Sequence, residues 1–279
     1  MGNSGLMNWA RNIFDFYINS SIHVALGVVA LTALTVLHFD LEPDYLLLSF
    51  VFFGTITGYN FVKYAGIAKL HHRSLAKNLK VIQIFSLGCF LALCYLAFQV
   101  NIKVLMVGGV LGFFTLLYAL PVFSRQKNLR SVAGLKVFVI AIIWAGVTVF
   151  FPIADADLSF EINSVLEYLQ RFLFVLILIL PFEIRDLKYD REDLRTIPQM
   201  LGVRKAKQLG YLLISMWVIL EFCKGISTSD SVAAIICAAG ITGFVVFKSD
   251  EDQPPYFSSF WVEGIPMLWF LLLLLFELS

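Results

Sequence analysis

The stretch Pro181-Phe-Glu-Ile-Arg-Asp-Leu-Lys-Tyr-Asp-Arg-Glu-Asp193 places a row of acidic side chains directly after an apolar segment. The four acids are Glu183, Asp186, Asp190 and Asp193. Their spacing of i, i+3, i+7 and i+10 would align them on one face of a helix. Carboxylates at this spacing repel one another unless a cation lies between them. Mg²⁺ is usually held by one or two carboxylates together with phosphate oxygens, so the motif predicts a metal site for a phosphorylated lipid.

The composition predicts a polytopic, all-α membrane protein. Of the 279 residues, 59% are hydrophobic and 15% are charged, which is outside the range of soluble domains. An apolar helix of about 20 residues spans a bilayer, and a helix satisfies its own backbone groups there. Nine such segments are predicted, roughly at 21–38, 45–64, 80–99, 103–123, 134–153, 163–183, 208–226, 230–247 and 258–277.

A weak internal repeat predicts two similar four-helix halves followed by a last helix. A shift that lays Lys63 on Arg185 also lays Arg73 on Arg195 and Leu79 on Leu201. Both segments follow a predicted span and run in the same direction, as in a parallel repeat. We therefore expect residues 1–279 to form one membrane domain, with halves at about 21–123 and 134–247.

The distribution of charge predicts the orientation in the membrane. Most Lys and Arg residues follow predicted spans two, four and six, and the segment after span four includes Arg125, Lys127, Arg130 and Lys136. The loops at the opposite side are acidic. By the positive-inside rule, the basic loops and the N-terminus are cytoplasmic and the C-terminus is external. The expected partner is the lipid bilayer, and no nucleic-acid interaction is expected.

The acidic motif resembles the second aspartate motif of the UbiA superfamily of intramembrane prenyltransferases. The resemblance is carried by Glu183-x-x-Asp186-x-x-x-Asp190 and by the following Leu-Arg-Thr-Ile-Pro-Gln-Met-Leu-Gly202. Tyr118-Ala-Leu-Pro121 is similar to the Tyr-x-x-Pro between that family's fourth and fifth helices. The first aspartate motif of the family would begin at Asn60, where Phe61, Tyr64 and Ala68 stand in place of its carboxylates.

The resemblance implies a nine-helix prenyltransferase, a transferase of alkyl groups other than methyl, that acts on an isoprenoid diphosphate at the cytoplasmic face. It implies one Mg²⁺ site in the second motif, whereas the first motif lacks the carboxylates for another. The implied metal ligands are Glu183, Asp186, Asp190 and Asp193. The implied catalytic residues are Asp186, Asp190 and, as a basic substitute in the first motif, Lys63. The implied substrate-binding residues are Asn60, Arg73, Tyr118, Lys127, Arg130 and Arg195.

Other functions remain open on the residues alone. An isoprenoid cyclase of the same fold would use the same diphosphate without an acceptor. A non-catalytic lipid-binding or partner-binding protein would be the result of losing the first metal site. Three further charged positions lie in the predicted spans. Glu167 and Arg171, spaced i, i+4, are expected to form a structural pair, and Glu263 is expected at a membrane boundary.

Overall fold

The structure, a computed structural model, describes residues 2–65, 76–120, 134–190 and 194–278. These residues form helices and connecting loops without a strand. The helices are α1 (Gly2–Asn19), α2 (Ile22–His38), α3 (Tyr45–Ala65), α4 (Ala76–Ala97), α5 (Ile102–Ala119), α6 (Lys136–Ala145), η3 (Gly146–Phe150), α7 (Phe151–Asp155), α8 (Ile162–Asp186), α9 (Ile197–Leu201), α10 (Val203–Cys223), α11 (Ser229–Lys248), η5 (Phe257–Val262) and α12 (Ile265–Glu277).

The spans agree with the prediction of about nine transmembrane helices. Within the described ranges, eight helices are long and apolar enough to cross a bilayer. A ninth results if α1 and α2, which are bent by 52° at their junction, count as one span. Several boundaries differ by a few residues: α4 begins at Ala76 and not at 80, α5 ends at Ala119 and not at 123, and α10 begins at Val203 and not at 208. The first turn of α10 carries basic residues that lower the local hydropathy but do not oppose a helix.

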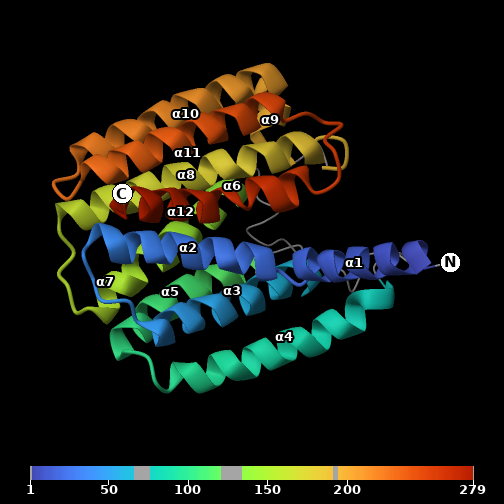
Figure 1. The fold of residues 1–279 in the computed structure, drawn as a ribbon, viewed down its shortest axis with the longest axis horizontal. Coiled ribbons are helices and arrows are strands. Elements are labelled where there is room, and N and C mark those ends of the chain that lie inside the picture. The colour runs from blue at the N-terminus through green and yellow to red at the C-terminus, as the bar shows by residue number, and fades with distance from the viewer. Residues whose placement is uncertain (1, 66–75, 121–133, 191–193, 279) are drawn as a thin grey trace.

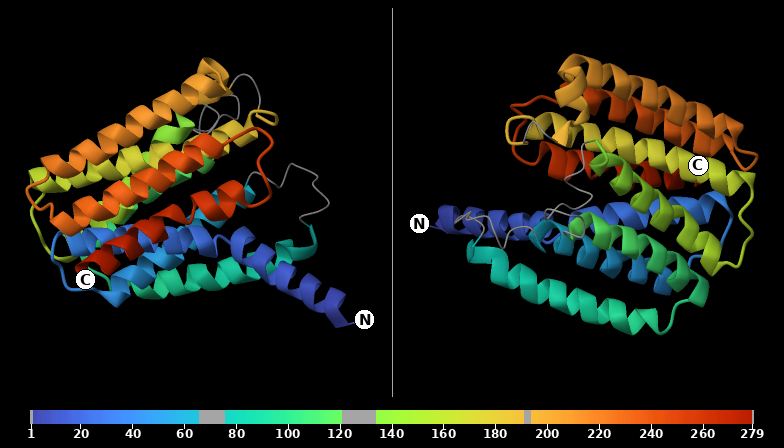
Figure 2. Two further views of the ribbon diagram at one scale, coloured as in Figure 1. Left: turned by 45° about the horizontal axis from the view of Figure 1, so that its top comes forward. Right: turned by 180° about the vertical axis from the view of Figure 1, so that it is seen from behind.

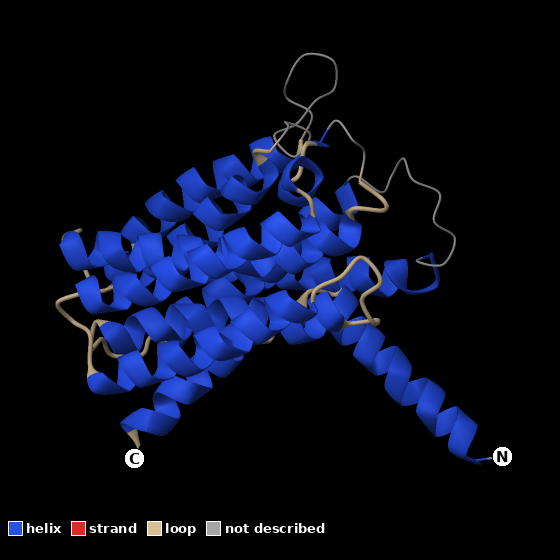
Figure 3. Ribbon diagram, turned by 90° about the horizontal axis from the view of Figure 1, so that it is seen from above, coloured by secondary structure: helices blue, strands red, loops and turns tan. Residues whose placement is uncertain are grey.

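The helices are arranged as a bundle with two distinct ends. The pair α10 and α11 lies along one side and α4 along the opposite side (Figure 1). Helix α4 packs mainly on α3 and lies outside the other helices in both views of Figure 2. Helix α1 extends away from the bundle (Figure 3). We call the end that holds the C-terminal ends of α3 and α8 the motif end, and the opposite end the far end.

The fifth span is interrupted by a π-helical turn where two helices approach closely. The span consists of α6, η3 and α7, and Gly146 is the first residue of η3. A Cβ atom on Gly146 would lie 2.8 Å from a methyl carbon of Leu111 on α5. Glycine at position 146 therefore permits this contact. Pro152 is the second residue of α7, a position in the first turn of a helix where proline is tolerated.

The largest hydrophobic cluster of the core contains three aromatic rings that join three helices of the C-terminal half. Trp217 and Trp269 are fully buried, as is Phe174. The Phe174 and Trp217 rings stack with centroids 4.6 Å apart, and Trp269 meets both edge-on at 5.1 and 4.9 Å. Such pairs contribute beyond their buried area, so this cluster fixes α8, α10 and α12 against one another.

A cluster of ionic side chains is buried at the far end, and we call it the buried ion cluster. Its members are His38, Glu167, Gln170, Arg171, Glu221 and Lys224. The expected Glu167–Arg171 pair is confirmed, with Nη2 2.6 Å from Oε1. Glu167 also accepts from Lys224 Nζ at 2.7 Å and contacts His38 Nδ1 at 3.1 Å.

The charges of the buried ion cluster are balanced by one another. Lys224 Nζ lies 2.6 Å from Glu221 Oε2, and Gln170 Nε2 donates to the same oxygen at 2.8 Å. Arg171 lies about 14 Å along α8 from its first residue, and its guanidinium is 4.9 Å from the Trp269 ring centroid. Ionic groups buried this deeply persist only when they are paired. The cluster therefore ties α2, α8 and α10 together.

We predict that Glu167→Gln strongly destabilises the bundle, because it leaves the surrounding cationic groups without their common acceptor. Removing one partner of a buried ion pair costs about 3–5 kcal/mol. The measurement is the denaturation midpoint of purified protein in detergent. The control is Asp157→Asn, which breaks an exposed pair with Lys103 and should change the midpoint little, because exposed pairs contribute little. Equal small shifts in the two variants would contradict the structural role of Glu167.

Candidate functional site at the motif end

The second aspartate motif lies where α8 ends. The helix ends at Asp186, so the expected helical alignment of all four acids is wrong beyond this residue. Asp190 lies in the following turn, and the backbone N–H of Asp190 donates to Asp186 O at 2.8 Å. Lys188 and Tyr189 in this turn are exposed, so burial of an apolar face does not favour a longer helix here. Asp193 lies outside the described residues.

Glu183 binds the beginning of α9. Its side chain is 1% exposed, and Oε2 accepts from the Ile197 N–H at 3.1 Å. A carboxylate at a helix N-terminus meets unpaired N–H groups there. Thr196, directly before α9, donates its N–H to Gln199 Oε1 at 2.9 Å. The segment after the motif is thus folded back onto the acid at its start.

Asp186 and Asp190 have different cationic partners. Asp186 forms two hydrogen bonds with its neighbour Arg185, at 2.8 and 3.2 Å. Asp190 Oδ2 lies 3.8 Å from Lys136 Nζ, the first residue of α6. Asp190 Oδ2 is buried and accepts no hydrogen bond from the described residues. A buried carboxylate oxygen without a donor is costly, and a bound cation would remove that cost.

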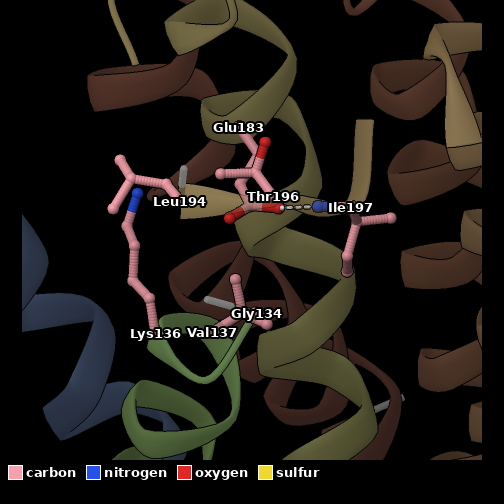
Figure 4. Close-up of a pocket in the computed structure, with 7 residues that line it drawn as sticks. All are labelled: Gly134, Lys136, Val137, Glu183, Leu194, Thr196 and Ile197. Carbon is pink, nitrogen blue, oxygen red and sulfur yellow. Dashed lines mark hydrogen bonds between the residues drawn. The ribbon is translucent and has the colours of Figure 1, made fainter. Parts of the chain in front are cut away.

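Glu183 and Lys136 line one small cavity, shown in Figure 4 with Gly134, Val137, Leu194, Thr196 and Ile197. The cavity measures about 10 Å³, close to what a single water molecule needs. In Figure 4, Lys136 rises from α6 toward Leu194, while Glu183 faces Ile197. This cavity has room for a water or a bare metal ion and none for a prenyl chain.

At the position of the first motif, Asn60 forms hydrogen bonds with other parts of the protein. Asn60 is 3% exposed, and its Nδ2 donates to Ser20 O at 3.0 Å and to Ser86 Oγ at 2.8 Å. Its Oδ1 accepts from Ser21 Oγ at 2.7 Å. Asn60 therefore joins the turn between α1 and α2 to α3 and α4. The prediction that Asn60 also contacts substrate stays a prediction.

Lys63 lies one turn beyond Asn60 and faces the same connection. Its Nζ donates to Asn19 O at 3.1 Å, and the Tyr64 hydroxyl donates to the same carbonyl at 2.8 Å. Lys63 and Arg185 both interact electrostatically with Glu263, at the start of the last helix. No ion pair joins Glu263 to either residue among the described side chains, and the expectation that Glu263 lies at a membrane boundary stays a prediction.

The remaining predicted residues are not all placed. Tyr118 is buried near the end of α5. Arg195 is exposed and has a φ of 46°, next to Leu194, whose carbonyl accepts from the Gly134 N–H at 3.0 Å. Three other predicted residues lie outside the described part of the chain, namely Arg73, Lys127 and Arg130. The structure brings Glu183, Asp186 and Asp190 together at the end of α8.

Lys136 is not among the predicted site residues. In the sequence it is only one of the basic residues after span four, because a lysine at the start of a span looks the same whether it contacts lipid headgroups or a carboxylate. The nearby Lys188 is also paired with a carboxylate, but one outside the motif. It hydrogen-bonds Asp252, and this hydrogen bond raises the pKa of Lys188 above its ordinary value.

The described acids offer carboxylates of the kind that a divalent cation uses. Asp190 supplies a buried oxygen without a donor, and Asp186, which is paired with Arg185, lies four residues earlier at the end of α8. No group of three or more His, Cys, Asp or Glu side chains arranged for a metal is present among the described residues. Mg²⁺ commonly uses only one or two carboxylates and completes its shell with water and substrate phosphates.

No protein-family model and no curated protein sequence matches the chain. Solved structures do match over 95% of it. A UbiA homologue from Archaeoglobus fulgidus is 13% identical, with a TM-score of 0.66, and the match covers its whole chain. The same homologue bound to GPP and Mg²⁺ has a TM-score of 0.66 and 14% identity, also with complete coverage. A digeranylgeranylglyceryl phosphate synthase has a TM-score of 0.56, 16% identity and 97% coverage.

The chain therefore has the fold of UbiA-type intramembrane prenyltransferases. Its apolar helices make it an integral, multi-pass membrane protein. The acids at the end of α8 and the basic residues around them define the candidate site of this fold.

We predict that Glu183→Ala loosens α9, because the Ile197 N–H loses its charged acceptor. A hydrogen bond to a charged group contributes about 1.5 kcal/mol or more, so amide exchange in residues 194–201 should accelerate by roughly tenfold. Hydrogen–deuterium exchange with mass spectrometry in detergent measures this. Glu183→Gln keeps a carbonyl acceptor and should stay near the wild type. Unchanged exchange in Glu183→Ala would show that the contact does not hold α9.

Proposed function

We propose that this chain binds an isoprenoid diphosphate at the motif end, at the cytoplasmic membrane face, and transfers its prenyl group to an acceptor. The observation that carries the proposal is the incompletely compensated acid Asp190 beside the cation Lys136, at the end of a bundle with this fold. A structural neighbour bound to GPP and Mg²⁺ supports the ligand class.

The residues of the site would act mainly on the charge of the diphosphate. In the proposed reaction the C–O bond to the diphosphate breaks, its electrons leave with the diphosphate, and an allylic cation remains. The acceptor then donates an electron pair to the cation and loses a proton. Lys136 and Arg185 are positioned to meet negative charge on the leaving group. Mg²⁺, held by Asp186 and Asp190, would add positive charge there.

The interior below the acids suits an apolar chain. Trp144 lies eight residues after Lys136 on α6, about 12 Å along the helix. It packs against three of the hydrophobic clusters, and its ring lies 6.4 Å from that of Tyr59 on α3. Aromatic faces stabilise nearby cations. We infer that these rings line the path of the prenyl chain between the two halves.

The non-catalytic alternative also has an observation in its favour. In the first motif, the amide of Asn60 and the ammonium of Lys63 already have protein partners. A lipid-binding protein would need no second metal site and could keep these contacts permanently. The cyclase alternative shares the proposed site and differs only in capturing the cation within the substrate.

We predict Mg²⁺-dependent binding of a non-hydrolysable isoprenoid thiodiphosphate to purified protein in detergent. Asp186→Asn should abolish the Mg²⁺ dependence, because it removes a metal-binding charge. Lys63→Met should weaken binding if this lysine contacts the diphosphate. Lys103→Met, at the far end, is the matched control and should bind as the wild type does. Calorimetric titration with and without Mg²⁺ measures all four proteins.

The outcomes distinguish the candidate functions. Absence of binding under every condition would reject the diphosphate proposal and favour the non-catalytic function. Where binding occurs, incubation with the hydrolysable diphosphate separates the enzymes. Release of inorganic diphosphate with a rearranged, acceptor-free hydrocarbon product would indicate a cyclase, and release that depends on an added acceptor would indicate a transferase.

A further inference from the structure

Lys136 is the only described cation within ion-pair distance of Asp190. Its Nζ lies 3.8 Å from Asp190 Oδ2, and both side chains are 20% exposed. Lys136 also interacts electrostatically with Glu183, which lines the same cavity. Figure 4 shows that the lysine and the glutamate reach this cavity from different helices, α6 and α8. The contact therefore depends on the packing of two spans.

Charge balance suggests what this lysine does. The described motif contains three carboxylates, and its two cationic partners are Lys136 and Arg185. One negative charge is left, which suits a single divalent cation. Without Lys136, two negative charges would be left at the end of α8. An ammonium group can also pair directly with phosphate oxygens, as a metal ion does.

We propose that Lys136 takes the place of one divalent cation in this site: it neutralises Asp190 and Glu183, competes with metal for Asp190, and pairs with a diphosphate oxygen when substrate binds. This inference rests on the proposed function for its last step. It explains how a chain whose first motif has lost its carboxylates can keep enough positive charge for a diphosphate. The lysine supplies that charge from α6, a helix outside both motifs.

A lysine that only contacts lipid headgroups would have different consequences. Such a residue would leave the affinity of the acids for metal unchanged. Lys188 provides the comparison within the same region, because its partner is Asp252 and it does not line the cavity. Removing the charge of either lysine changes the net charge of the protein equally, so a difference between them reports the local contact.

The test measures Mn²⁺ binding by electron paramagnetic resonance to the wild type, Lys136→Gln, Lys136→Met and Lys188→Gln in detergent. We expect both substitutions at Lys136 to tighten Mn²⁺ binding about threefold to fivefold, the range for removing a partly exposed competing ion pair. Lys188→Gln should match the wild type. Two variants at Lys136 are used so that poor folding of one does not prevent the measurement.

Asp190→Asn provides a double-mutant cycle with Lys136→Gln. If the lysine acts through this carboxylate, most of the tightening should disappear in the Asp190→Asn background. A second titration uses inorganic pyrophosphate without metal, for which Lys136→Gln and Lys136→Met should bind several-fold more weakly than the wild type, because a charged phosphate contact is lost.

Unchanged or weaker Mn²⁺ binding in both Lys136 variants would overturn the inference. Equal tightening in Lys188→Gln would also overturn it, because the effect would then be one of net charge. Failure of the proposed function has a separate signature: the wild type would bind no isoprenoid thiodiphosphate, whereas Mn²⁺ binding would still respond to the substitutions at Lys136.

Discussion

Charged groups inside a lipid-embedded helical bundle need partners, because no water is available to solvate them. The two ends of this molecule meet that requirement differently. At the far end, Glu167 accepts hydrogen bonds from Arg171 and Lys224, and Glu221 pairs with Lys224 and accepts from the Gln170 amide. At the motif end, a carboxylate oxygen of Asp190 is buried without a donor. The paired end stabilises the arrangement of the helices, and the incomplete end is where a ligand can contribute binding energy.

Polar side chains at both predicted aspartate-motif positions make contacts within the protein. In the first, Asn60 and Lys63 donate to backbone carbonyls of the connection between α1 and α2. In the second, Glu183 accepts from the start of α9 and Asp186 pairs with Arg185. These contacts hold the helix ends at the motif end together.

Much of the fold could be predicted because a long apolar segment in lipid can satisfy its backbone hydrogen bonds only as a helix. The predicted spans agree with the described helices to within a few residues in most cases. The end of α8 could not be predicted, since the i, i+3, i+7 pattern continues past Asp186 although the helix does not. Likewise, the contact between Lys136 and Asp190 could not be predicted, because the two residues are 54 positions apart and Lys136 is on another helix.

The sequence by itself determined the membrane-spanning helices, the acidic character of the segment after α8 and the absence of carboxylates at Phe61 and Tyr64. These are local properties that composition and spacing express directly. Tertiary structure alone decided which cation of one helix faces which acid of another. Lys136 meets Asp190, and Lys224 meets Glu167, only because α6, α8 and the end of α10 pack side by side. Ion pairs form over a few ångströms of space, and a distance in sequence carries little information about them.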